Sequence, residues 1–273
     1  MSEAADPVRA GNDIPPDIDT SVAHIARVYN YWLGGTTNYP ADREAAQQAM
    51  AAYPDMALSA RANRAFLART VRWLAGRGIR QFLDIGTGIP TKNNTHEVAQ
   101  AIAPESRVVY ADHDPIVLAH ARSLLTSGPE GATAYLEADL RQPGAILTEA
   151  GRTLDLGQPV AIVLMAVLQF VTDEERPADV VAELMDAVPG GSYLVVSHPA
   201  SDIDAAAMRE VAKRLNRLMA QRVTPRSRAE VTRFFDGLDL IEPGVVRIPE
   251  WRPDAPADRG IPSTMWGGVG QKA

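Results

Sequence analysis

Residues 81–90, Gln-Phe-Leu-Asp-Ile-Gly-Thr-Gly-Ile-Pro, constrain the fold of this chain more than any other stretch. A short apolar segment reaches Asp84 and passes into the turn Gly86-Thr87-Gly88, after which a helical segment is expected from about Lys92. Such a turn between a strand and a helix brings a ligand close to backbone N–H groups, because glycine lets backbone approach where a Cβ would clash. The stretch therefore predicts a nucleotide-binding turn after the first strand of an α/β domain.

Downstream of residue 80, strand-like and helix-like segments alternate. We expect strands at about 81–85, 107–111, 133–137, 160–166 and 192–197, and helices at about 92–102, 115–125, 143–150 and 174–187. The run from Val160 to Leu168 is almost purely apolar, which is typical of a central parallel strand covered by helices on both faces. The alternation predicts a doubly wound, mostly parallel sheet.

The end of the chain breaks this alternation. An amphipathic helix is expected at 203–220, and a short helix capped by Ser227 is expected to run to about Phe235. Two further strands, 238–246 and 265–270, follow without a crossover helix, so they should form an antiparallel pair at the edge of the sheet. The fold class predicted is α/β, with a mostly parallel seven-stranded sheet and an antiparallel edge strand.

The N-terminal part of the chain contains no expected strand. Its first residues are rich in Pro, Gly and Asp, which predicts a flexible arm. Helices are expected from an N-cap at Thr20-Ser21 to Gly34-Gly35, then at about 41–52 and 57–75. The predicted organisation is an arm at 1–19, a helical lid at 20–78 and a Rossmann-like ligand-binding domain at 79–273.

The composition argues against several function classes. The chain has no cysteine, which excludes disulfides and thiol nucleophiles, and its five histidines show no metal-ligand spacing, so no metal is expected. The formal net charge of −7 argues against non-specific nucleic-acid binding. No apolar run is long enough for a membrane helix, and no N-terminal apolar region suggests a signal peptide. We expect a cytoplasmic protein with a small-molecule partner, and the oligomeric state stays open.

Acidic residues end three of the expected strands, at Asp84, Asp112 and Asp139. A carboxylate beside the glycine turn can pair with an ammonium group, and the next two can accept hydrogen bonds from ribose hydroxyls and an adenine amino group. A dinucleotide also needs the second acid, but its fingerprint requires a third glycine where Thr91 stands. Such acids can instead cap helices, which we prefer for Asp114. For the three strand-end acids together we favour S-adenosylmethionine as the ligand.

Several runs of the sequence carry a resemblance to a known family. They are Arg27-Val28-Tyr29-Asn30-Tyr31-Trp32-Leu33-Gly34-Gly35, Asn38 to Arg43, Arg61 to Phe66, Gln81 to Thr91, Val109 to Pro115 and Trp266 to Lys272. With them the chain resembles the actinobacterial S-adenosyl methyltransferase family, once labelled a domain of unknown function, within the class I methyltransferases. The resemblance covers about residues 20–273. It implies a Rossmann-like fold with a helical lid, S-adenosyl-L-methionine as cofactor and S-adenosyl-L-homocysteine as product.

The residues and the resemblance together assign a set of site residues. We expect the cofactor to contact Tyr29, Asn38, Arg64, Asp84, Gly86, Thr87, Gly88, Asp112, His113, Asp139 and Leu140. Tyr39, in the loop after Gly34-Gly35, and Gln169, after the fourth strand, are expected to contact the substrate. His198, at the end of the fifth strand, is either a general base near the transferred methyl group or a histidine whose ring is satisfied by backbone.

The chain departs from the family pattern at three places. Asn30 stands where Asp is common, Thr36-Thr37 where Lys-Asp is common, and Gln169 where His is common. We expect a methyltransferase acting on an oxygen or nitrogen of a small molecule. The alternative is a regulatory protein that binds S-adenosylmethionine or S-adenosylhomocysteine without catalysis, and the changed lid residues motivate it. An NAD(P) oxidoreductase is disfavoured by the missing third glycine.

Overall fold

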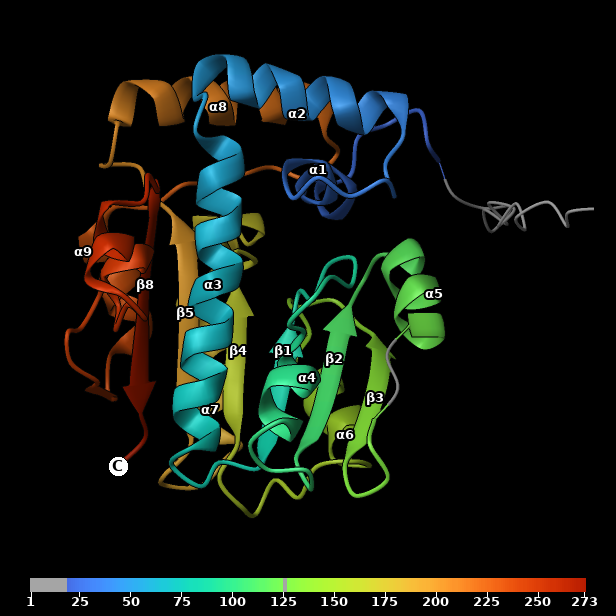
Figure 1. Ribbon diagram of the computed structural model, residues 1–273, viewed down its shortest axis with the longest axis vertical. Coiled ribbons are helices and arrows are strands. Elements are labelled where there is room, and N and C mark those ends of the chain that lie inside the picture. The colour runs from blue at the N-terminus through green and yellow to red at the C-terminus, as the bar shows by residue number, and fades with distance from the viewer. Residues whose placement is uncertain (1–18, 125–126) are drawn as a thin grey trace, which may run out of the picture.

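The chain folds around one mixed β-sheet that carries helices on both faces (Figure 1). The computed structural model describes residues 19–124 and 127–273, so nearly all of the predicted arm at 1–19 lies outside the described residues. The strands are β1 (Gln81–Ile85), β2 (Arg107–Asp112), β3 (Ala132–Glu137), β4 (Ala161–Met165), β5 (Tyr193–Pro199), β6 (Asp239–Leu240), β7 (Val246–Arg247) and β8 (Met265–Gln271).

Helices make up most of the remaining regular structure. The α-helices are α1 (Ile25–Trp32), α2 (Pro40–Ala52), α3 (Met56–Ala75), α4 (Thr95–Gln100), α5 (Pro115–Leu124), α6 (Pro143–Ala150), α7 (Pro177–Asp186), α8 (Ala205–Leu218) and α9 (Arg228–Thr232). The 3₁₀ helices are η1 (Leu168–Phe170), η2 (Asp173–Glu175), η3 (Arg233–Phe235), η4 (Ile248–Glu250) and η5 (Pro256–Gly260). Within the described ranges, no helix is long and apolar enough to cross a membrane.

The strand order is β3-β2-β1-β4-β5-β8-β6, with β7 also paired to β8. The neighbouring pairs among β1 to β5 are parallel, whereas β8 is antiparallel to β5, β6 and β7. The predicted mostly parallel sheet with an antiparallel edge is therefore confirmed. Because the chain moves outward in one direction from β1 and in the other from β4, the C-terminal ends of these two strands form a topological switch point.

The first of the two predicted C-terminal strands, 238–246, is two short strands rather than one. Pro243 has no N–H to donate to a ladder, and Gly244 has a φ of +79°. The chain therefore turns between β6 and β7, and both strands pair with β8.

α1 and α4 are among the helices that begin later than predicted. α1 does not start at Ser21, because the N–H and Oγ of Ser21 both donate to Asp19 instead of capping a helix. α4 starts only after Asn94, which forms a capping box with Glu97. In both cases a local hydrogen bond, rather than the apolar pattern, sets the helix boundary.

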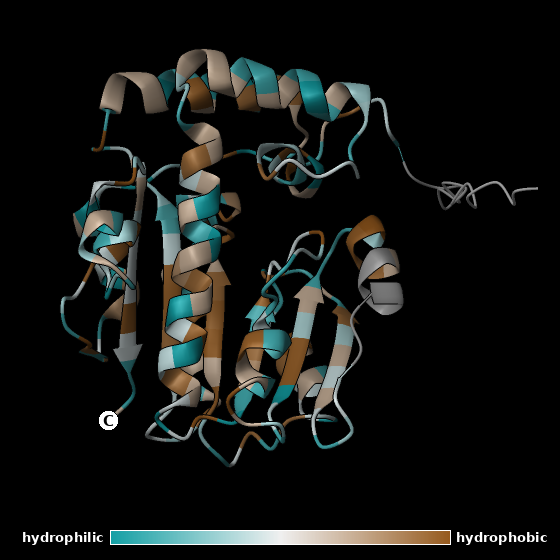
Figure 2. Ribbon diagram, viewed as in Figure 1, coloured by the Kyte–Doolittle hydropathy of each residue, from teal (hydrophilic) through white to brown (hydrophobic). Residues whose placement is uncertain are grey.

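β1 shows how the sheet is buried on both faces. Leu83 and Ile85 pack on the face covered by α6, α7 and η3, whereas Phe82 packs on the face covered by α3 and α4. Side chains alternate along a strand, so only a continuous apolar run can supply both cores. Figure 2 shows such hydrophobic stretches along β2 and β4.

Helices α1, α2 and α8 form a cap over the C-terminal ends of the parallel strands (Figure 1). The three helices share an apolar cluster that includes Val28, Ala45 and Met208. The backbone of Ala23, just before α1, also pairs with Met219, just after α8. The cap is thus assembled from segments far apart in the sequence, and the N-terminal end of α3 rises into it (Figure 1).

Candidate active site

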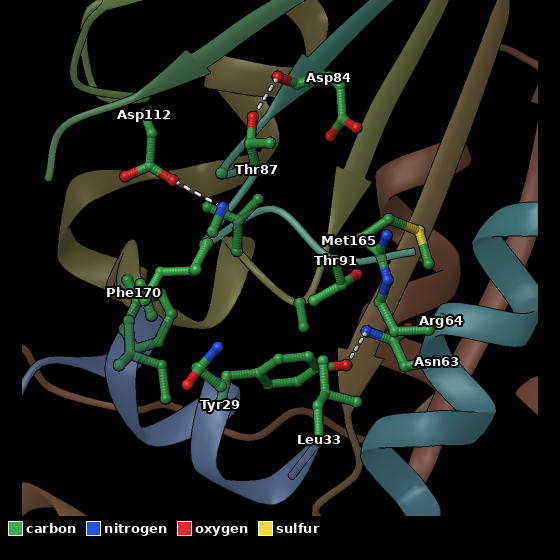
Figure 3. Close-up of a pocket in the computed structure, with 18 of the residues that line it drawn as sticks. Tyr29, Leu33, Asn63, Arg64, Asp84, Thr87, Thr91, Asp112, Met165 and Phe170 are labelled. Carbon is green, nitrogen blue, oxygen red and sulfur yellow. Dashed lines mark hydrogen bonds between the residues drawn. The ribbon is translucent and has the colours of Figure 1, made fainter. Parts of the chain in front are cut away.

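A cleft opens at the switch point of the sheet, beneath α1 (Figure 3). It measures about 850 Å³, counted together with the space that is open to solvent. Its walls come from α1, α3, the glycine turn after β1, the end of β2 and the segment that follows β4. Ligands of open α/β sheets bind at this position, outside the carboxyl ends of the strands.

The glycine turn forms one wall of the cleft. Gly86 and Gly88 have φ angles of +77° and +65°, in the left-handed region that glycine adopts without strain. A Cβ on Gly86 would clash with the side chain of Val167, whereas a Cβ on Gly88 would meet no atom within 4 Å. Gly86 therefore lets the loops after β1 and β4 approach each other, and Gly88 leaves its backbone accessible to a ligand.

Asp84 is a buried acid at the end of β1. Its Oδ2 accepts a hydrogen bond of 2.6 Å from Thr95 Oγ1. Burial raises the pKa of Asp84 to about 6, although the Thr95 hydrogen bond and the charge of Arg64 act in the opposite direction. Since burial disfavours the charged form of a carboxyl group, a cation bound here would meet a carboxylate that has little other solvation.

Asp112 is held in place at the end of β2. Its Oδ2 accepts a hydrogen bond of 2.9 Å from the Gly88 N–H, and its Oδ1 accepts one of 3.0 Å from the Asp114 N–H. An ionised carboxylate has about four acceptor positions, so two remain for hydroxyl groups of a ligand. Asp114 accepts from the Ile116 N–H at 2.8 Å, which confirms its predicted role as a helix cap.

Three buried polar atoms in the cleft have no hydrogen-bond partner among the described residues: Asn63 Oδ1, Arg64 Nε and Gln221 Oε1. Asn63 Nδ2 donates to the Tyr29 hydroxyl at 3.0 Å, which orients the amide (Figure 3). Unpaired buried polar groups cost free energy, which a polar ligand would recover. Arg64 Nε suits a carboxylate, and the two amide oxygens suit hydroxyl or amino groups. The cleft therefore fits S-adenosylmethionine.

Most of the predicted cofactor residues meet in this cleft. Those that line it are Tyr29, Arg64, Asp84, Gly86, Thr87, Gly88, Asp112 and His113. Arg64 also donates to the carbonyl oxygen of Asn93 at 3.2 Å, which joins α3 to the loop before α4. The His113 ring is hydrogen-bonded to Gln221, so the loop after β2 contacts the segment that follows α8.

Asp139 and Leu140 do not line the cleft, contrary to the prediction. Asp139 Oδ1 accepts hydrogen bonds from the backbone N–H and the guanidinium of Arg141, at 2.9 and 3.2 Å. Leu140 is buried in the core on the face of α6 and α7. The acid after β3 is therefore engaged within its own loop, and this geometry does not support an adenine contact.

Asn38 and Tyr39 also lie outside the residues that line the cleft. The Asn38 amide donates to Asn30 Oδ1 at 3.0 Å and to the Gly35 carbonyl oxygen at 2.9 Å. The Tyr39 N–H donates to Asp42 Oδ2 at the start of α2. Both residues shape the connection between α1 and α2, because the Asn38 amide and the Tyr39 N–H donate hydrogen bonds within that segment.

His198 is fully buried, and it does not line the cleft. Its Nδ1 lies 2.9 Å from the Pro199 carbonyl oxygen, and its Nε2 lies 3.0 Å from Arg226 Nη1. Burial lowers the pKa of His198 to about 3, so the ring is neutral at physiological pH. Of the two predicted alternatives, this geometry supports the histidine satisfied by its neighbours and not the general base.

A second chamber, which is mostly apolar, lies beside the cleft. It measures about 630 Å³, again counted with open space, and its wall comes from α1, α3, α8 and the start of β8. Ile25, Tyr29, Ala166 and Phe170 line both spaces, so the chamber and the cleft share a wall. Gln169, which was expected to contact the substrate, lines the chamber.

Ala166 is a position at the shared wall that the sequence reasoning missed. Its φ of +50° is uncommon for a residue with a Cβ. Its N–H is held by the carbonyl oxygen and the Oγ of Ser197, at 3.0 and 3.1 Å. Backbone strain of this kind clusters at ligand sites. The place of Ala166 at the end of the fourth strand is a signal that could have found it, whereas Asn63 and Gln221 carry no such signal.

Comparisons with known proteins agree with this geometry. A family model described as S-adenosyl methyltransferase matches residues 12–273. A DUF574 family protein from Streptomyces avermitilis MA-4680 is 45% identical, with a TM-score of 0.90, over 93% of this chain and 99% of that chain. A proposed methyltransferase from Thermobifida fusca YX is 39% identical, with a TM-score of 0.88, over 96% of this chain and 99% of that chain. No curated protein matches the sequence.

A more distant structure shares the fold alone. The mitomycin 7-O-methyltransferase MmcR is 18% identical, with a TM-score of 0.50, over 76% of this chain and 54% of that chain. The family match, in contrast, spans nearly the whole sequence and agrees with the sheet order and the glycine turn. The chain therefore belongs to the S-adenosyl methyltransferase family, whose members are S-adenosylmethionine-dependent methyltransferases, and it has the class I Rossmann-like fold.

Proposed function

We propose that this protein binds S-adenosylmethionine in the cleft and methylates an oxygen or nitrogen atom of a small molecule held in the neighbouring chamber. The observation that carries the proposal is the wall of Ile25, Tyr29, Ala166 and Phe170, which a polar cleft and an apolar chamber share. When bound, S-adenosylmethionine supplies an electrophilic methyl group, and the electron pair of the broken C–S bond stays on sulfur to give S-adenosylhomocysteine.

The polar residues of the cleft would hold the methionine end and the ribose of this cofactor. Asp84 would pair with the ammonium group, and Arg64 would bind the carboxylate through its unpartnered Nε. Asp112 would accept hydrogen bonds from the ribose hydroxyls, because two of its acceptor positions are not used by Gly88 and Asp114. A cofactor held at these two points has little freedom to move along the cleft.

The chamber contributes position rather than proton transfer. Tyr29 is the only titratable residue among the described residues that line it, and burial raises the pKa of Tyr29 above its usual value. Tyr29 is therefore neutral at physiological pH and cannot act as a base. Holding two reactants in line is enough to accelerate a displacement strongly, and the proton of the acceptor passes to water.

Calorimetry tests the cofactor part of this proposal. We expect S-adenosylmethionine and S-adenosylhomocysteine to bind and NAD⁺ not to bind. At 100 times its Kd, S-adenosylhomocysteine should add about 2.7 kcal/mol to the free energy of unfolding and raise Tm by roughly 5–10 °C. Stabilisation by NAD⁺ but not by S-adenosylhomocysteine would contradict the proposal.

Turnover separates the enzyme from the binding protein. Purified protein incubated with methyl-labelled S-adenosylmethionine and a set of phenols and amines should yield a labelled product. If both cofactor forms bind while no acceptor in the set or in a metabolite extract is labelled, the regulatory alternative is supported, because binding without turnover is what a non-catalytic protein shows.

A further inference from the structure

We propose that the apolar chamber selects a neutral, mostly apolar acceptor that presents one O–H or N–H group to Gln169. This inference rests on the proposed function, because it takes the chamber as the acceptor site. It adds the chemical class of the acceptor and the residue that recognises it.

The walls of the chamber exclude charged ligands. Its large side chains are aromatic, aliphatic or thioether groups, namely Trp32, Met56, Phe170, Met208, Val211, Leu215, Val223 and Met265. None of the described residues that line it carries a formal charge. Moving a carboxylate, sulfonate or phosphate from water into such surroundings without a partner is strongly unfavourable. The occupant is therefore a neutral molecule whose surface is mostly apolar.

Gln169 supplies the polar contact. Its side-chain Nε2 donates a hydrogen bond of 2.6 Å to the Ala166 carbonyl oxygen, which sets the orientation of the amide. Its Oε1 is buried and has no partner among the described residues, and the residue is only 4% exposed. An amide oxygen accepts hydrogen bonds, so a matching ligand must donate one.

Two other polar side chains in the chamber are already paired. The Ser59 Oγ accepts a hydrogen bond of 3.3 Å from the Thr264 N–H, and the Tyr29 hydroxyl donates to the Ala60 carbonyl oxygen at 3.0 Å. Gln169 Oε1 is thus the one buried side-chain polar atom without a partner among the described residues that line the chamber. Gln169 can therefore recognise a hydrogen-bond donor on the ligand.

The position of Gln169 places that donor next to the cofactor cleft. Gln169 is hydrogen-bonded to Ala166, and Ala166 lines both the chamber and the cleft. A hydroxyl or N–H group bound to Gln169 Oε1 thus lies near the wall that the chamber shares with the cleft. The atom that donates the hydrogen bond is, in this proposal, the atom that is methylated.

The chamber, counted together with the space that is open to solvent, measures about 630 Å³. A bicyclic aromatic compound with one hydroxyl group matches its apolar lining and the single acceptor atom of Gln169, and 2-naphthol is a simple probe of that class.

Three probes test the selection rule on the wild-type protein in the presence of S-adenosylhomocysteine. 2-Naphthol is neutral and donates a hydrogen bond, 2-methoxynaphthalene is neutral without a donor, and 2-naphthalenesulfonate is anionic. Calorimetry should show that 2-naphthol binds about fivefold more tightly than the methoxy compound, from one hydrogen bond. The sulfonate should not bind. Binding of the sulfonate at least as tight as that of 2-naphthol would overturn the proposal.

Variants test where 2-naphthol binds and whether Gln169 recognises its hydroxyl group. Ala212→Phe on α8 should fill the chamber and weaken 2-naphthol binding by about tenfold or more, because Ala212 lines it. Ala206→Phe, on the exposed side of the same helix, is the matched control and should leave binding unchanged. Gln169→Met should remove the preference for 2-naphthol over the methoxy compound. A preference that persists in Gln169→Met would contradict the role of its Oε1.

The affinity for S-adenosylhomocysteine distinguishes a failure of the acceptor proposal from a failure of the proposed methyltransferase function. If it binds wild-type protein and Ala212→Phe equally well, the fold and the cofactor site of the variant are intact. A wrong order among the three probes then refutes the acceptor class and leaves the methyltransferase proposal standing. If S-adenosylhomocysteine fails to bind the wild-type protein, the proposed function fails, and the acceptor proposal, which rests on it, falls as well.

Discussion

Asp84 and Asp112 end neighbouring strands, but their carboxylates are solvated in different ways. Asp112 accepts two backbone hydrogen bonds, from Gly88 and Asp114. Asp84 accepts a hydroxyl hydrogen bond from Thr95 in a buried site that raises its pKa. Asp112 is thus already ordered for neutral hydroxyl donors, whereas Asp84 gains most from a cation, and in the proposed binding mode Asp112 faces the ribose and Asp84 the ammonium group.

Asp112→Asn tests the ribose contact. The amide has fewer acceptor positions and loses the charge, so S-adenosylhomocysteine should bind about 10- to 100-fold more weakly by calorimetry. Asp139→Asn is the matched control and should bind within about twofold of wild type, because Asp139 lies outside the cleft and is engaged by Arg141. Equal losses in the two variants would contradict the distinction between the two acids.

Asp84→Asn tests the buried charge through its pH dependence. The folded-state pKa of about 6 lies above the usual 3.8, so the folded protein binds more protons than the unfolded chain between these values. The wild-type free energy of unfolding therefore loses this contribution as pH rises. Measured by urea denaturation without ligand, the variant should gain about 2 kcal/mol relative to wild type between pH 4.5 and pH 7. A difference that does not change with pH would contradict the buried-carboxyl assignment.

The position of α1 over the cleft depends on a buried ion pair with α2. Arg27 Nε lies 3.1 Å from Asp42 Oδ1, and the two side chains are 3% and 0% exposed. Asp42 also accepts hydrogen bonds from the N–H groups of His24 and Tyr39, at 2.9 and 2.8 Å. One carboxylate therefore holds the start of α1, its middle and the start of α2 together.

Asp42→Ala should detach α1 from α2. It leaves the Arg27 guanidinium buried without its charged partner, which typically costs about 3–5 kcal/mol of stability. S-adenosylhomocysteine affinity should fall as well, since α1 lines the cleft. Asp254→Ala is the control, because its pair with Arg72 is 61% and 52% exposed and should contribute less than about 1 kcal/mol. Urea denaturation checks both variants, and a similar loss in each would refute the argument.

At the scale of the whole molecule, the sheet, the cap and α3 all contribute residues to the site. The sheet contributes Asp84 and Asp112 at the ends of β1 and β2, and the cap contributes Tyr29 from α1. Gln221, which follows α8, reaches the cleft from the other end of the chain and bonds His113. The cleft and the chamber exist only where the cap lies on the sheet, so the site depends on packing between distant segments.

Residue order alone was enough to predict the parallel strands, the glycine turn and the acids at 84 and 112. These features are local, and the carboxyl ends of parallel strands necessarily meet at one edge of the sheet. Gly86 is a clear case, because its sequence context already demands a turn, and the structure shows the left-handed backbone.

Loop conformation and long-range packing settled the rest. Asp139, Asn38 and His198 have residue types suited to a ligand, but Arg141, Gly35 and Arg226 engage their polar atoms within the protein. The partners of Asp139 and Asn38 lie two and three residues away, in loops whose conformation the apolar pattern does not specify, whereas Arg226 reaches His198 only when separate elements pack. The apolar chamber likewise arises where α1, α3 and α8 meet β8. Gln169 Oε1 therefore lies at the chamber, without a partner among the described residues, only because these elements pack together.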